Sequence, residues 1–412
     1  MTELDLYMNQ KGQEYREIDR FRAKRIYNLL KPYLKKIPKI IQIIGTNGKG
    51  STGRFLSLML MQNDLKILHF TSPHILDFKE RFYKNGKIIS NEEIINAHKF
   101  LQSFDFMQEA SYFEYATFLA LVLAYDVSYL ILEAGVGGEY DSTSIVERDL
   151  VLFTLIDFDH EEMLGNTIDS IATTKLNAMT SNAIIGFQKY NVVYEIAKDI
   201  AKKNNTNLII LKDLKQNCIN NTNSQQNYKD SNFFTDSKKN PIGSNKIDFN
   251  KINLYLKKHN LALFLGENLA LALSATEMLG LKCDLESLAK LDLKGRFEQI
   301  SKNIIIDVGH NKSAALAIKK SLKNKKVILV YNSYFQKNII EILGILKENI
   351  IRIEILEIED NKRIIKKENL IKILQSLNID FSDFRGIQEQ NDYLIFGSFS
   401  VVEKFITYFE RK

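Results

Sequence analysis

The chain has 412 residues, of which 45% are hydrophobic and 26% charged, so it is long enough for two or three globular domains with substantial cores. Its formal net charge of +6 comes from scattered lysines that alternate with acidic residues. Because there is no arginine-rich arm and no mixed basic and aromatic patch, we expect no nucleic-acid partner. No apolar run reaches membrane-spanning length, the N-terminus is acidic rather than signal-like, and Cys218 and Cys283 have neither metal nor disulfide spacing. We therefore expect a cytoplasmic protein that does not bind membranes.

A glycine-rich stretch between a predicted strand and a predicted helix is the first sign of function. Residues 40–44 have the composition of a buried strand, and Gly-Thr-Asn-Gly-Lys-Gly-Ser-Thr follows at 45–52. Ser51 and Thr52 are favoured at helix N-caps, and an apolar helical run follows them. Such a turn directs free N–H groups at an anion, and Lys49 adds positive charge, so the pattern predicts a phosphate site. One glycine separates the lysine from the serine, unlike the usual G-x-x-x-x-G-K-[ST], so a glycine-rich turn with an incidental lysine stays the alternative.

Strands and helices are predicted to alternate through the first part of the chain. The strands follow from apolar β-type runs, and the helices from apolar spacing and from caps such as Ser90 with Glu93. The predicted strands lie at 40–44, 65–70, 127–132 and 151–156. The predicted helices lie before residue 39, after the glycine-rich turn, through residue 101, from Ser111 onwards, and at 166–178. This alternation predicts a mostly parallel, doubly wound sheet.

A polar segment interrupts this pattern. Residues 212–250 are dominated by Asn, Ser, Gln and Lys, which predicts a long low-complexity insertion. Weak strands are predicted on either side of it, at 208–211 and 252–256. A helix at 260–279 is expected to follow.

A second α/β unit is predicted after about residue 293. Its strands are expected at 304–306, 327–330, 351–356 and 393–396, with helices between them. We therefore expect a larger domain at 1–293, which carries the insertion, and a smaller domain at 294–412.

Polar residues follow the strands of the first unit at the point where each strand ends. In chain order they are Lys49 and Ser51, Ser72 and His74, Glu133, and Asp159 with His160. In sheets of this kind, ligands bind outside the carboxyl ends of the strands. We therefore expect these residues to share one edge of the sheet.

These residue types fit a magnesium–nucleotide site. Magnesium prefers hard oxygen ligands, so the Ser72 hydroxyl and the Glu133 carboxylate are candidate ligands, and His160 is a candidate for a second metal position. The alternatives are a buried acid paired with a lysine for Glu133, and a helix-capping or core histidine for His160. The residues alone predict an ATP-dependent transferase or ligase, with a kinase or a motor ATPase left open.

Eight short motifs stand in order along the chain and carry a family resemblance. They are Gly-Thr-Asn-Gly-Lys-Gly-Ser (45–51), Thr-Ser-Pro-His (71–74), Tyr-Phe-Glu (112–114), Leu-Glu-Ala-Gly-Val-Gly-Gly (132–138), Asp-His (159–160) with Leu-Gly (164–165), Gly-Arg-Phe (295–297), Asp-Val-Gly-His-Asn (307–311) and Gly-Ser-Phe (397–399). The series resembles the folylpolyglutamate synthase/dihydrofolate synthase family of the Mur ligase superfamily. The resemblance implies an α/β protein of two domains. The larger N-terminal domain is of P-loop type with a mostly parallel sheet, like the Mur ligase central domain, and the smaller C-terminal domain is Rossmann-like.

The resemblance also implies an activity. The family uses ATP and Mg²⁺, with a monovalent cation as a further candidate, to join L-glutamate to dihydropteroate or to the γ-carboxylate of a folate. The acceptor carboxylate becomes an acyl phosphate, which the glutamate amine then attacks. The resemblance implies small-molecule substrates and a monomer.

Site residues carry over by position. The nucleotide contacts are Gly45, Thr46, Asn47, Gly48, Lys49, Gly50, Ser51, Asn268, Arg296, Asp307 and His310. The metal ligands are Ser72, Glu133 and His160, and the catalytic group comprises Lys49, His160 and Lys175, a lysine that is carbamylated in the family. The pterin pocket comprises Tyr112, Phe113, Glu114, Tyr140, Asp141 and Ser142.

Two alternatives to this function stay open. One is a Mur-type ligase that acts on another carboxylic acid, such as a peptidoglycan precursor; the match to the pterin pocket argues against it. The other is a nucleotide-binding protein without catalysis. The presence of Lys49, Glu133, His160 and Arg296 argues against that.

Overall fold

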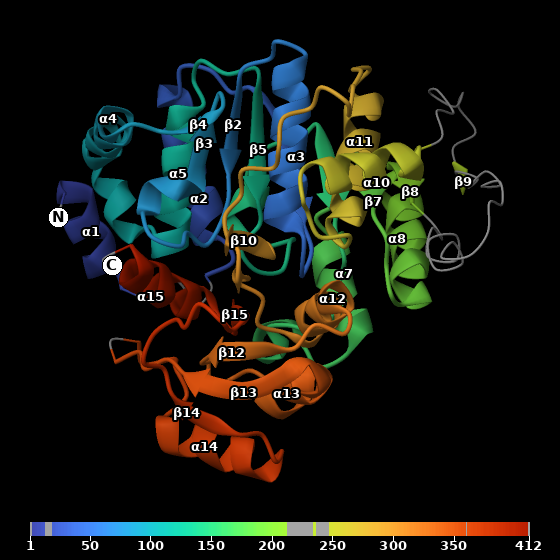
Figure 1. The fold of residues 1–412 in the computed structure, drawn as a ribbon. Helices are drawn as coiled ribbons and strands as arrows, with labels where there is room; N and C mark the ends of the chain where they lie inside the picture. The colour runs from blue at the N-terminus through green and yellow to red at the C-terminus, as the bar shows by residue number, and fades with distance from the viewer. Residues whose placement is uncertain (1, 13–18, 212–233, 236–246, 360, 411–412) are drawn as a thin grey trace. The chain divides into compact units, whose positions relative to one another are not determined.

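The computed structural model describes residues 2–12, 19–211, 234–235, 247–359 and 361–410, so most of the predicted insertion at 212–250 lies outside the described residues. The chain forms two compact units (Figure 1). Unit 1 comprises Met1–Ser72, Lys79–Ile252 and Glu267–Leu291, and unit 2 comprises Pro73–Phe78, Asn253–Gly266 and Asp292–Lys412.

Unit 1 is built on a sheet whose described strands run in the order β4-β3-β2-β5-β1-β6-β7-β8-β9. Its strands are β1 (Lys39–Ile44), β2 (Ile67–Phe70), β3 (Phe82–Lys84), β4 (Lys87–Ile88), β5 (Tyr129–Glu133), β6 (Leu150–Phe153), β7 (Asn182–Ile185), β8 (Asn207–Ile210) and β9 (Phe234–Thr235). The run from β2 to β8 is parallel, and the antiparallel strands β3, β4 and β9 lie at the two edges. The central strands are apolar and buried, as expected for parallel strands covered on both faces.

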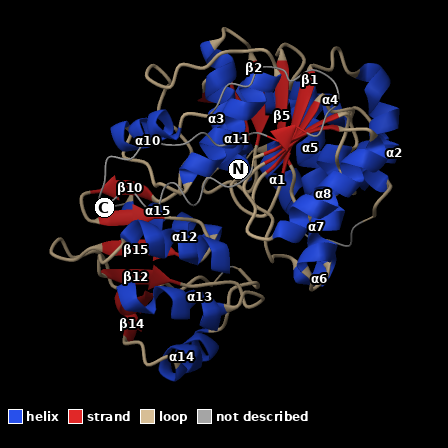
Figure 2. Ribbon diagram, turned by 90° about the vertical axis from the view of Figure 1, so that its right-hand side faces the viewer, coloured by secondary structure: helices blue, strands red, loops and turns tan. Residues whose placement is uncertain are grey.

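Helices cover both faces of this sheet, with α3 and α11 on one side and α5, α7 and α8 on the other (Figure 2). The described helices that begin in unit 1 are α1 (Glu3–Lys11), α2 (Arg22–Leu30), α3 (Lys49–Gln62), α4 (Asn91–Gln102), α5 (Tyr112–Leu123), α6 (Glu161–Leu164), α7 (Ile168–Leu176), α8 (Asn191–Asn204) and α10 (Phe249–Lys258), and α11 (Leu265–Met278) follows them. Short 3₁₀ turns lie at Lys31–Tyr33, Phe78–Arg81, Asp105–Glu109 and Ser142–Ser144. No described helix is both long and apolar enough to cross a bilayer.

The order of strands reverses beside β1. The chain leaves β1 through α3 towards β2, and it leaves β6 through α7 towards β7 on the other side of the sheet. The loops that follow β1, β5 and β6 therefore emerge next to one another, at the point where open α/β sheets bind ligands. The predicted parallel, doubly wound sheet is confirmed.

Unit 2 contains a smaller sheet with the order β10-β11-β15-β12-β13-β14, parallel except for β10. Its strands are β10 (Glu298–Ser301), β11 (Ile304–Ile306), β12 (Val327–Tyr331), β13 (Ile350–Ile355), β14 (Phe381–Asp383) and β15 (Tyr393–Phe396). Its helices are α12 (Lys312–Leu322), α13 (Ile339–Leu346), α14 (Lys367–Ser376) and α15 (Phe399–Phe409), with a 3₁₀ turn at Lys347–Asn349. Two apolar clusters, around Leu329 and around Val330, cover its two faces.

Three local predictions were wrong. The weak strand expected at 252–256 is part of helix α10, where Ile252, Tyr255 and Leu256 are buried at helical spacing. The helix expected at 260–279 begins at Leu265. Helix α3 begins at Lys49 with Gly48 in a left-handed N-cap and no side-chain cap, because Ser51 and Thr52 lie inside the helix and are buried.

Other local signals were right. The predicted Ser90–Glu93 capping box is present at the start of α4, with Glu93 N donating to Ser90 Oγ at 3.2 Å and Ser90 N donating to Glu93 Oε2 at 3.0 Å. A second box, Ser111 with Glu114, begins α5. Both boxes satisfy backbone N–H groups at the helix ends.

Helix α3 can lie close to the sheet because residue 53 is a glycine. A Cβ atom at Gly53 would come within 2.3 Å of His69 Nε2 on β2. His69 is fully buried, and neither of its ring nitrogens has a hydrogen-bond partner among the described residues. Burial, reinforced by Arg54, holds the pKa of His69 well below its usual value, so the ring packs against the glycine as a neutral group.

We expect Gly53→Ala to lower the free energy of unfolding by about 1–3 kcal/mol, because the methyl group overpacks the buried contact with His69. Denaturant unfolding of both proteins measures the difference. Gly344→Ala is the matched control, since a Cβ at that exposed position in α13 meets nothing within 4 Å and alanine favours a helix. A Gly53→Ala protein as stable as the wild type would show that α3 has room to move away from the sheet.

Candidate active site

The loop from Gly45 to Gly48 has the backbone shape that the glycine-rich sequence predicted. A Cβ at Gly45 would lie 1.9 Å from Thr154 Oγ1, so only glycine fits against the end of β6. Gly48 has a φ of 89°, which favours glycine, and a Cβ there would lie 2.2 Å from Asn268 Oδ1. The structure therefore places Asn268, a predicted nucleotide contact, directly beside the loop.

Thr46 fixes this loop to the segment that follows β6. Its N–H donates to Leu155 O at 2.8 Å, its hydroxyl donates to Asp157 O at 2.9 Å, and Asp157 N donates back to that hydroxyl at 3.0 Å. Asn47 N also donates to Leu155 O, at 3.3 Å. The loop is thus held along its length before any ligand binds.

Two lysines converge on one carbonyl of the loop. Lys49 Nζ donates to Gly45 O at 3.2 Å, and Lys175 Nζ, from α7, donates to the same oxygen at 3.1 Å. Neither lysine forms an ion pair with a carboxylate among the described residues, and Lys175 is buried. Burial, reinforced by the Lys49 ammonium, lowers the pKa of Lys175 to about 7. Two lysine amines therefore meet at one carbonyl, and an anion bound beside them would favour the charged form of Lys175.

Glu133 lies at the end of β5 and faces the end of the neighbouring strand β2. Its Oε2 accepts hydrogen bonds from the Thr71 hydroxyl and, at 3.3 Å, from Ser72 N. Glu133 is buried, with 3% of its surface exposed. The predicted pair Ser72 and Glu133 is therefore brought together, as the shared sheet edge required.

His160 lies in the loop after β6, immediately before α6, and has a left-handed backbone with φ 52°. Its N–H bonds to Asp159 Oδ1 at 3.0 Å, and its Nδ1 lies 3.7 Å from Glu162 Oε1. The described residues contain no group of three or more His, Cys, Asp or Glu side chains arranged to hold a metal. Magnesium needs no such cage, because it is usually held by one or two carboxylates together with waters and substrate phosphates. The Glu133 carboxylate, together with the Ser72 hydroxyl, could supply the few protein oxygen ligands that magnesium needs.

Asp141 organises the turn that follows β5. Its Oδ2 accepts from Gly135 N at 2.9 Å and Val136 N at 3.0 Å, and its Oδ1 accepts from Thr143 N at 2.9 Å. The adjacent Ser142 hydroxyl lies 2.7 Å from Thr117 Oγ1. Burial raises the pKa of Asp141, against these hydrogen bonds. Of the three residues predicted at 140–142, Asp141 and Ser142 are thus internal and Tyr140 is exposed.

The predicted Tyr112, Phe113 and Glu114 lie in the first turn of α5. The Phe113 ring packs across Gly135, where a Cβ would lie 2.8 Å from Phe113 Cε1, and its centroid is 5.7 Å from that of Phe70. The Tyr112 ring faces the Arg81 guanidinium at 5.5 Å. Phe113 therefore connects the turn after β5 with the end of β2.

Unit 2 carries the other three predicted nucleotide contacts, with Arg296 just before β10 and with Asp307 and His310 just after β11. Asp307 Oδ2 accepts from Phe297 N at 2.8 Å and its Oδ1 from Gly309 N at 2.7 Å. Burial raises the pKa of Asp307 to about 6, while Arg296 acts in the opposite direction. His310 Nδ1 lies 3.1 Å from Val308 O, and its ring and the Arg296 guanidinium both approach Phe399.

The sequence analysis missed three residues that support the site. The Thr71 hydroxyl donates to Glu133, and the Thr154 side chain packs against Gly45. The main-chain carbonyl of Asp157 accepts from the Thr46 hydroxyl. Thr71 and Asp157 directly follow predicted strands, whereas Thr154 lies inside a predicted strand and directly follows the observed strand β6. Thr71 belongs to the quoted motif 71–74, so the same argument that placed Ser72 at the sheet edge applied to it as well.

Comparison with known proteins identifies the family. No protein-family model matches the chain. A dihydrofolate synthase/folylpolyglutamate synthase of Buchnera aphidicola subsp. Baizongia pistaciae is 31% identical over 329 residues, which cover 77% of this chain and 70% of that protein. The crystal structure of Helicobacter pylori folylpolyglutamate synthetase is 39% identical, with a TM-score of 0.75 over 99% of this chain and 98% of that one. The chain belongs to the folylpolyglutamate synthase/dihydrofolate synthase family.

More distant structures of this family share the fold. A bifunctional folylpolyglutamate synthase/dihydrofolate synthase crystallised with Mn, AMPPNP and L-glutamate is 23% identical, with a TM-score of 0.78 over 100% of this chain and 98% of that one. The predicted family, the α/β fold and the class of ATP-dependent ligase are confirmed. The roles of the individual site residues in this family member stay predictions.

The low pKa of Lys175 predicts a pH-dependent stability. Below about pH 7 both the folded and the unfolded protein hold the Lys175 proton, so the folded state bears the full cost of a buried charge. Between about pH 7 and pH 10.5 only the unfolded state holds that proton, so the free energy of unfolding that Lys175 contributes rises with pH. Lys175→Met should therefore be more stable, relative to wild type, at about pH 6.5 than at about pH 9.5.

Thermal unfolding of the ligand-free family member at several pH values measures this. Lys99→Met, at an exposed position in α4, is the control and should show a difference from wild type that does not change with pH. If the Lys175→Met difference is equally flat, the Lys175 amine is not buried beside Lys49 as described.

Proposed function

We propose that this chain is an ATP-dependent ligase that joins the amine of L-glutamate to the carboxylate of dihydropteroate or to the γ-carboxylate of a folate. The observation that carries the proposal is the convergence of Lys49 and Lys175 on the Gly45 carbonyl, where neither lysine forms an ion pair with an acid of the described residues. An anion with several oxygens, such as a polyphosphate, is the ligand that this arrangement suits. The folate-type acceptor and the glutamate are inferred from the names of the relatives, a dihydrofolate synthase/folylpolyglutamate synthase and a folylpolyglutamate synthetase.

The reaction must first turn the acceptor carboxylate into an electrophile. A carboxylate oxygen attacks the γ-phosphorus of ATP, the bond to the β-γ bridging oxygen breaks, and ADP and an acyl phosphate result. The glutamate nitrogen then attacks the acyl carbon, loses a proton, and expels inorganic phosphate to leave an amide. One ATP is therefore converted to ADP and phosphate for each amide formed.

The residues of unit 1 would help the first step by reducing charge repulsion. Lys49 and the N–H groups of the glycine loop are suited to bind the phosphate oxygens that crowd together as the two anions approach. Ser72 and Glu133 are suited to hold a divalent cation, which would further neutralise the phosphate charge when bound. The manganese, AMPPNP and L-glutamate bound to a relative of the same fold support this choice of ligands.

The substrates of the proposed function are small molecules, and no described helix could span a bilayer. We infer a monomer in the cytoplasm that needs no nucleic acid or membrane for activity. Size-exclusion chromatography with light scattering would measure the oligomeric state.

We expect the purified protein to release phosphate from MgATP only when L-glutamate and an acceptor acid are both present, because the acyl phosphate forms on the acceptor and is consumed by the amine. A coupled phosphate assay with dihydropteroate or tetrahydrofolate measures this, and mass spectrometry identifies the amide. Release with a UDP-linked peptidoglycan precursor instead of either acceptor would favour the Mur-type alternative. Nucleotide binding without release would favour the non-catalytic one.

Replacing Lys49 or Glu133 with alanine should lower kcat by at least about 10²–10³-fold, as removal of a group that stabilises transition-state charge does. The thermal unfolding midpoint should show that both variants remain folded. Lys99→Ala, an exposed lysine of α4, controls for loss of positive charge and should keep wild-type turnover. Turnover retained by folded Lys49→Ala or Glu133→Ala protein would refute the role proposed for that residue.

A further inference from the structure

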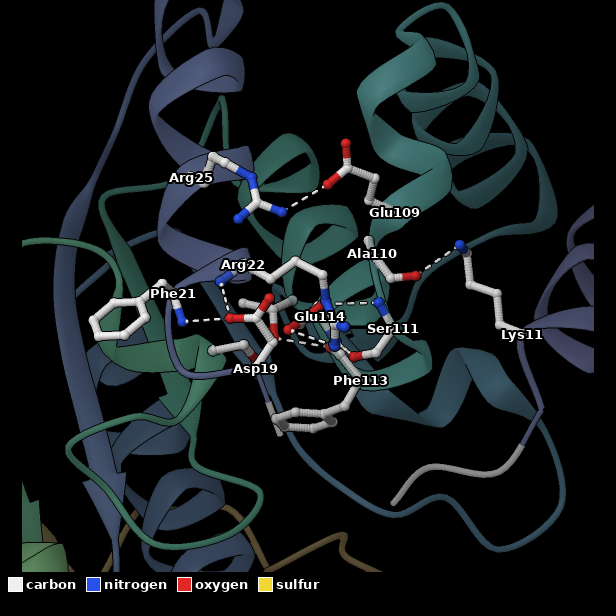
Figure 3. A network of polar contacts seen from close by, with 12 residues as sticks. Lys11, Asp19, Phe21, Arg22, Arg25, Glu109, Ala110, Ser111, Phe113 and Glu114 are labelled. Carbon is white, nitrogen blue, oxygen red and sulfur yellow. Dashed lines mark hydrogen bonds and ion pairs between the residues drawn. The ribbon is translucent and has the colours of Figure 1, made fainter. Parts of the chain in front are cut away.

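An ion pair joins the N-terminal helix α2 to the first turn of α5. Arg22 Nε donates to Glu114 Oε2 at 2.8 Å, and an Arg22 terminal nitrogen donates to Glu114 Oε1 at 3.2 Å (Figure 3). This two-point geometry is the strong form of an arginine–carboxylate contact. The side chains are 22% and 10% exposed, so the pair is largely withdrawn from water.

The carboxylate of Glu114 accepts hydrogen bonds from two other residues of the protein. Its Oε2 also accepts from Ser111 N at 2.7 Å, and Glu114 N donates to Ser111 Oγ at 3.4 Å in the capping box of α5. Asp19 in turn accepts from Phe21 N and Arg22 N at the start of α2 (Figure 3). Both carboxylate oxygens of Glu114 therefore accept hydrogen bonds, and the carboxylate connects the first turn of α5 to the first turn of α2.

This carboxylate lies beside a residue that is predicted to form the acceptor pocket. Phe113 directly precedes Glu114, and its ring packs against Gly135 and Phe70. Any shift of the first turn of α5 would move this ring across the turn that follows β5. The position of Phe113 thus depends on where Glu114 is held.

The same N-terminal segment also contacts the turn at 140–145, which carries further residues of the predicted acceptor pocket. The Arg20 guanidinium lies 4.6 Å from the centroid of the Tyr140 ring, and Lys24 Nζ donates to Ile145 O at 2.6 Å. Together with Arg22, these basic residues connect one segment of the chain to α5 and to the turn at 140–145. Through these contacts the segment 20–24 joins the first turn of α5, which carries Phe113, to the turn that carries Tyr140.

We propose that Arg22 and Glu114 are positioning residues that set the affinity for the acceptor acid, by holding Phe113 and the turn at 140–145 in register. The proposal rests on the proposed function, since it names residues that act on the acceptor side of that reaction. Glu114 acts through its neighbours and does not touch the substrate. This differs from the direct contact that the family resemblance implied for it.

Helix α2 also supplies a matched control. Arg25 binds Glu109 at 2.7 Å, but these side chains are 53% and 54% exposed (Figure 3). Exposed pairs of this kind contribute little to stability. Arg25 and Arg22 belong to the same helix and carry the same charge, so comparing them separates the position of the pair from its charge.

The test is steady-state kinetics on the full-length protein with dihydropteroate and, separately, tetrahydrofolate as acceptor. Arg22→Met should raise the acceptor KM by about 10-fold to 100-fold, because displacement of Phe113 and of the turn at 140–145 would remove contacts that bind the acceptor equally in the ground state and in the transition state. The KM for ATP and the kcat at saturating acceptor should stay close to wild type. Arg22→Lys should restore part of the affinity, since lysine keeps the charge but not the two-point geometry. Arg25→Met should leave all three constants unchanged.

Glu114→Gln keeps the test decisive if Arg22→Met does not fold. Glutamine is accepted at this position of a capping box, so the variant removes the negative charge and keeps the cap. It should raise the acceptor KM in the same direction as Arg22→Met. Thermal unfolding midpoints, measured for every variant, report the structural effect separately.

An unchanged acceptor KM in folded Arg22→Met or Glu114→Gln protein, with only a lower unfolding midpoint or a lower kcat, would overturn the proposal in favour of a purely structural pair. An equal rise of KM in Arg25→Met would also overturn it. If the wild-type protein releases no glutamate-dependent phosphate with either acceptor, the proposed function fails, and this proposal fails with it.

Discussion

The rest of the site depends on the hydrogen bonds that the Gly45 carbonyl accepts. One comes from Lys49 Nζ and the other from Lys175 Nζ. These two bonds require β1 to end where it does, α3 to begin at Lys49 without a side-chain cap, and α7 to direct Lys175 back across the sheet edge. No side-chain oxygen caps α3, and the N–H groups at a helix N-terminus are suited to bind an anion. A buried ammonium group is unfavourable on its own, so this part of the loop lowers the stability of the folded protein at pH values where Lys175 is charged.

Much of this arrangement was predictable because it follows from order along the chain. Parallel strands bring their carboxyl ends to one edge of the sheet. Lys49, Ser72 and Glu133 could therefore be assigned to a shared edge from strand order alone, with no interatomic distance known. The structure places Ser72 and Glu133 at this edge, where Ser72 N donates to Glu133 Oε2. Asn268, which was assigned by the resemblance and not by strand order, lies in α11 beside Gly48. The capping box at Ser90 was equally readable, because its two bonds are local and depend only on residue type and a spacing of three.

The features that sequence reasoning missed or misjudged depend on partners far along the chain. The segment 252–256 has β-type residues, yet it is helical, because burial of Ile252, Tyr255 and Leu256 on one face outweighs local preference. The short strand β7 has only four residues and is defined by its neighbours β6 and β8. Glu114 belonged to a motif that suggested a ligand contact, and the arginine that engages it lies in a different helix, where no motif marked it.

The pairing of β1 has a consequence for the order in which the protein is made. Lys39 pairs with Tyr129 and Ile41 with Leu150, so the strand that carries the glycine loop has no neighbours until those distant segments have left the ribosome. Parallel pairing over such separations is slow to form, since a long loop must close before any contact rewards it. Lys175 emerges later still, so the two lysines that meet at the Gly45 carbonyl cannot come together until much of unit 1 has been translated. During synthesis the apolar strand β1 is therefore exposed until its neighbours emerge, and such exposed strands are prone to aggregate.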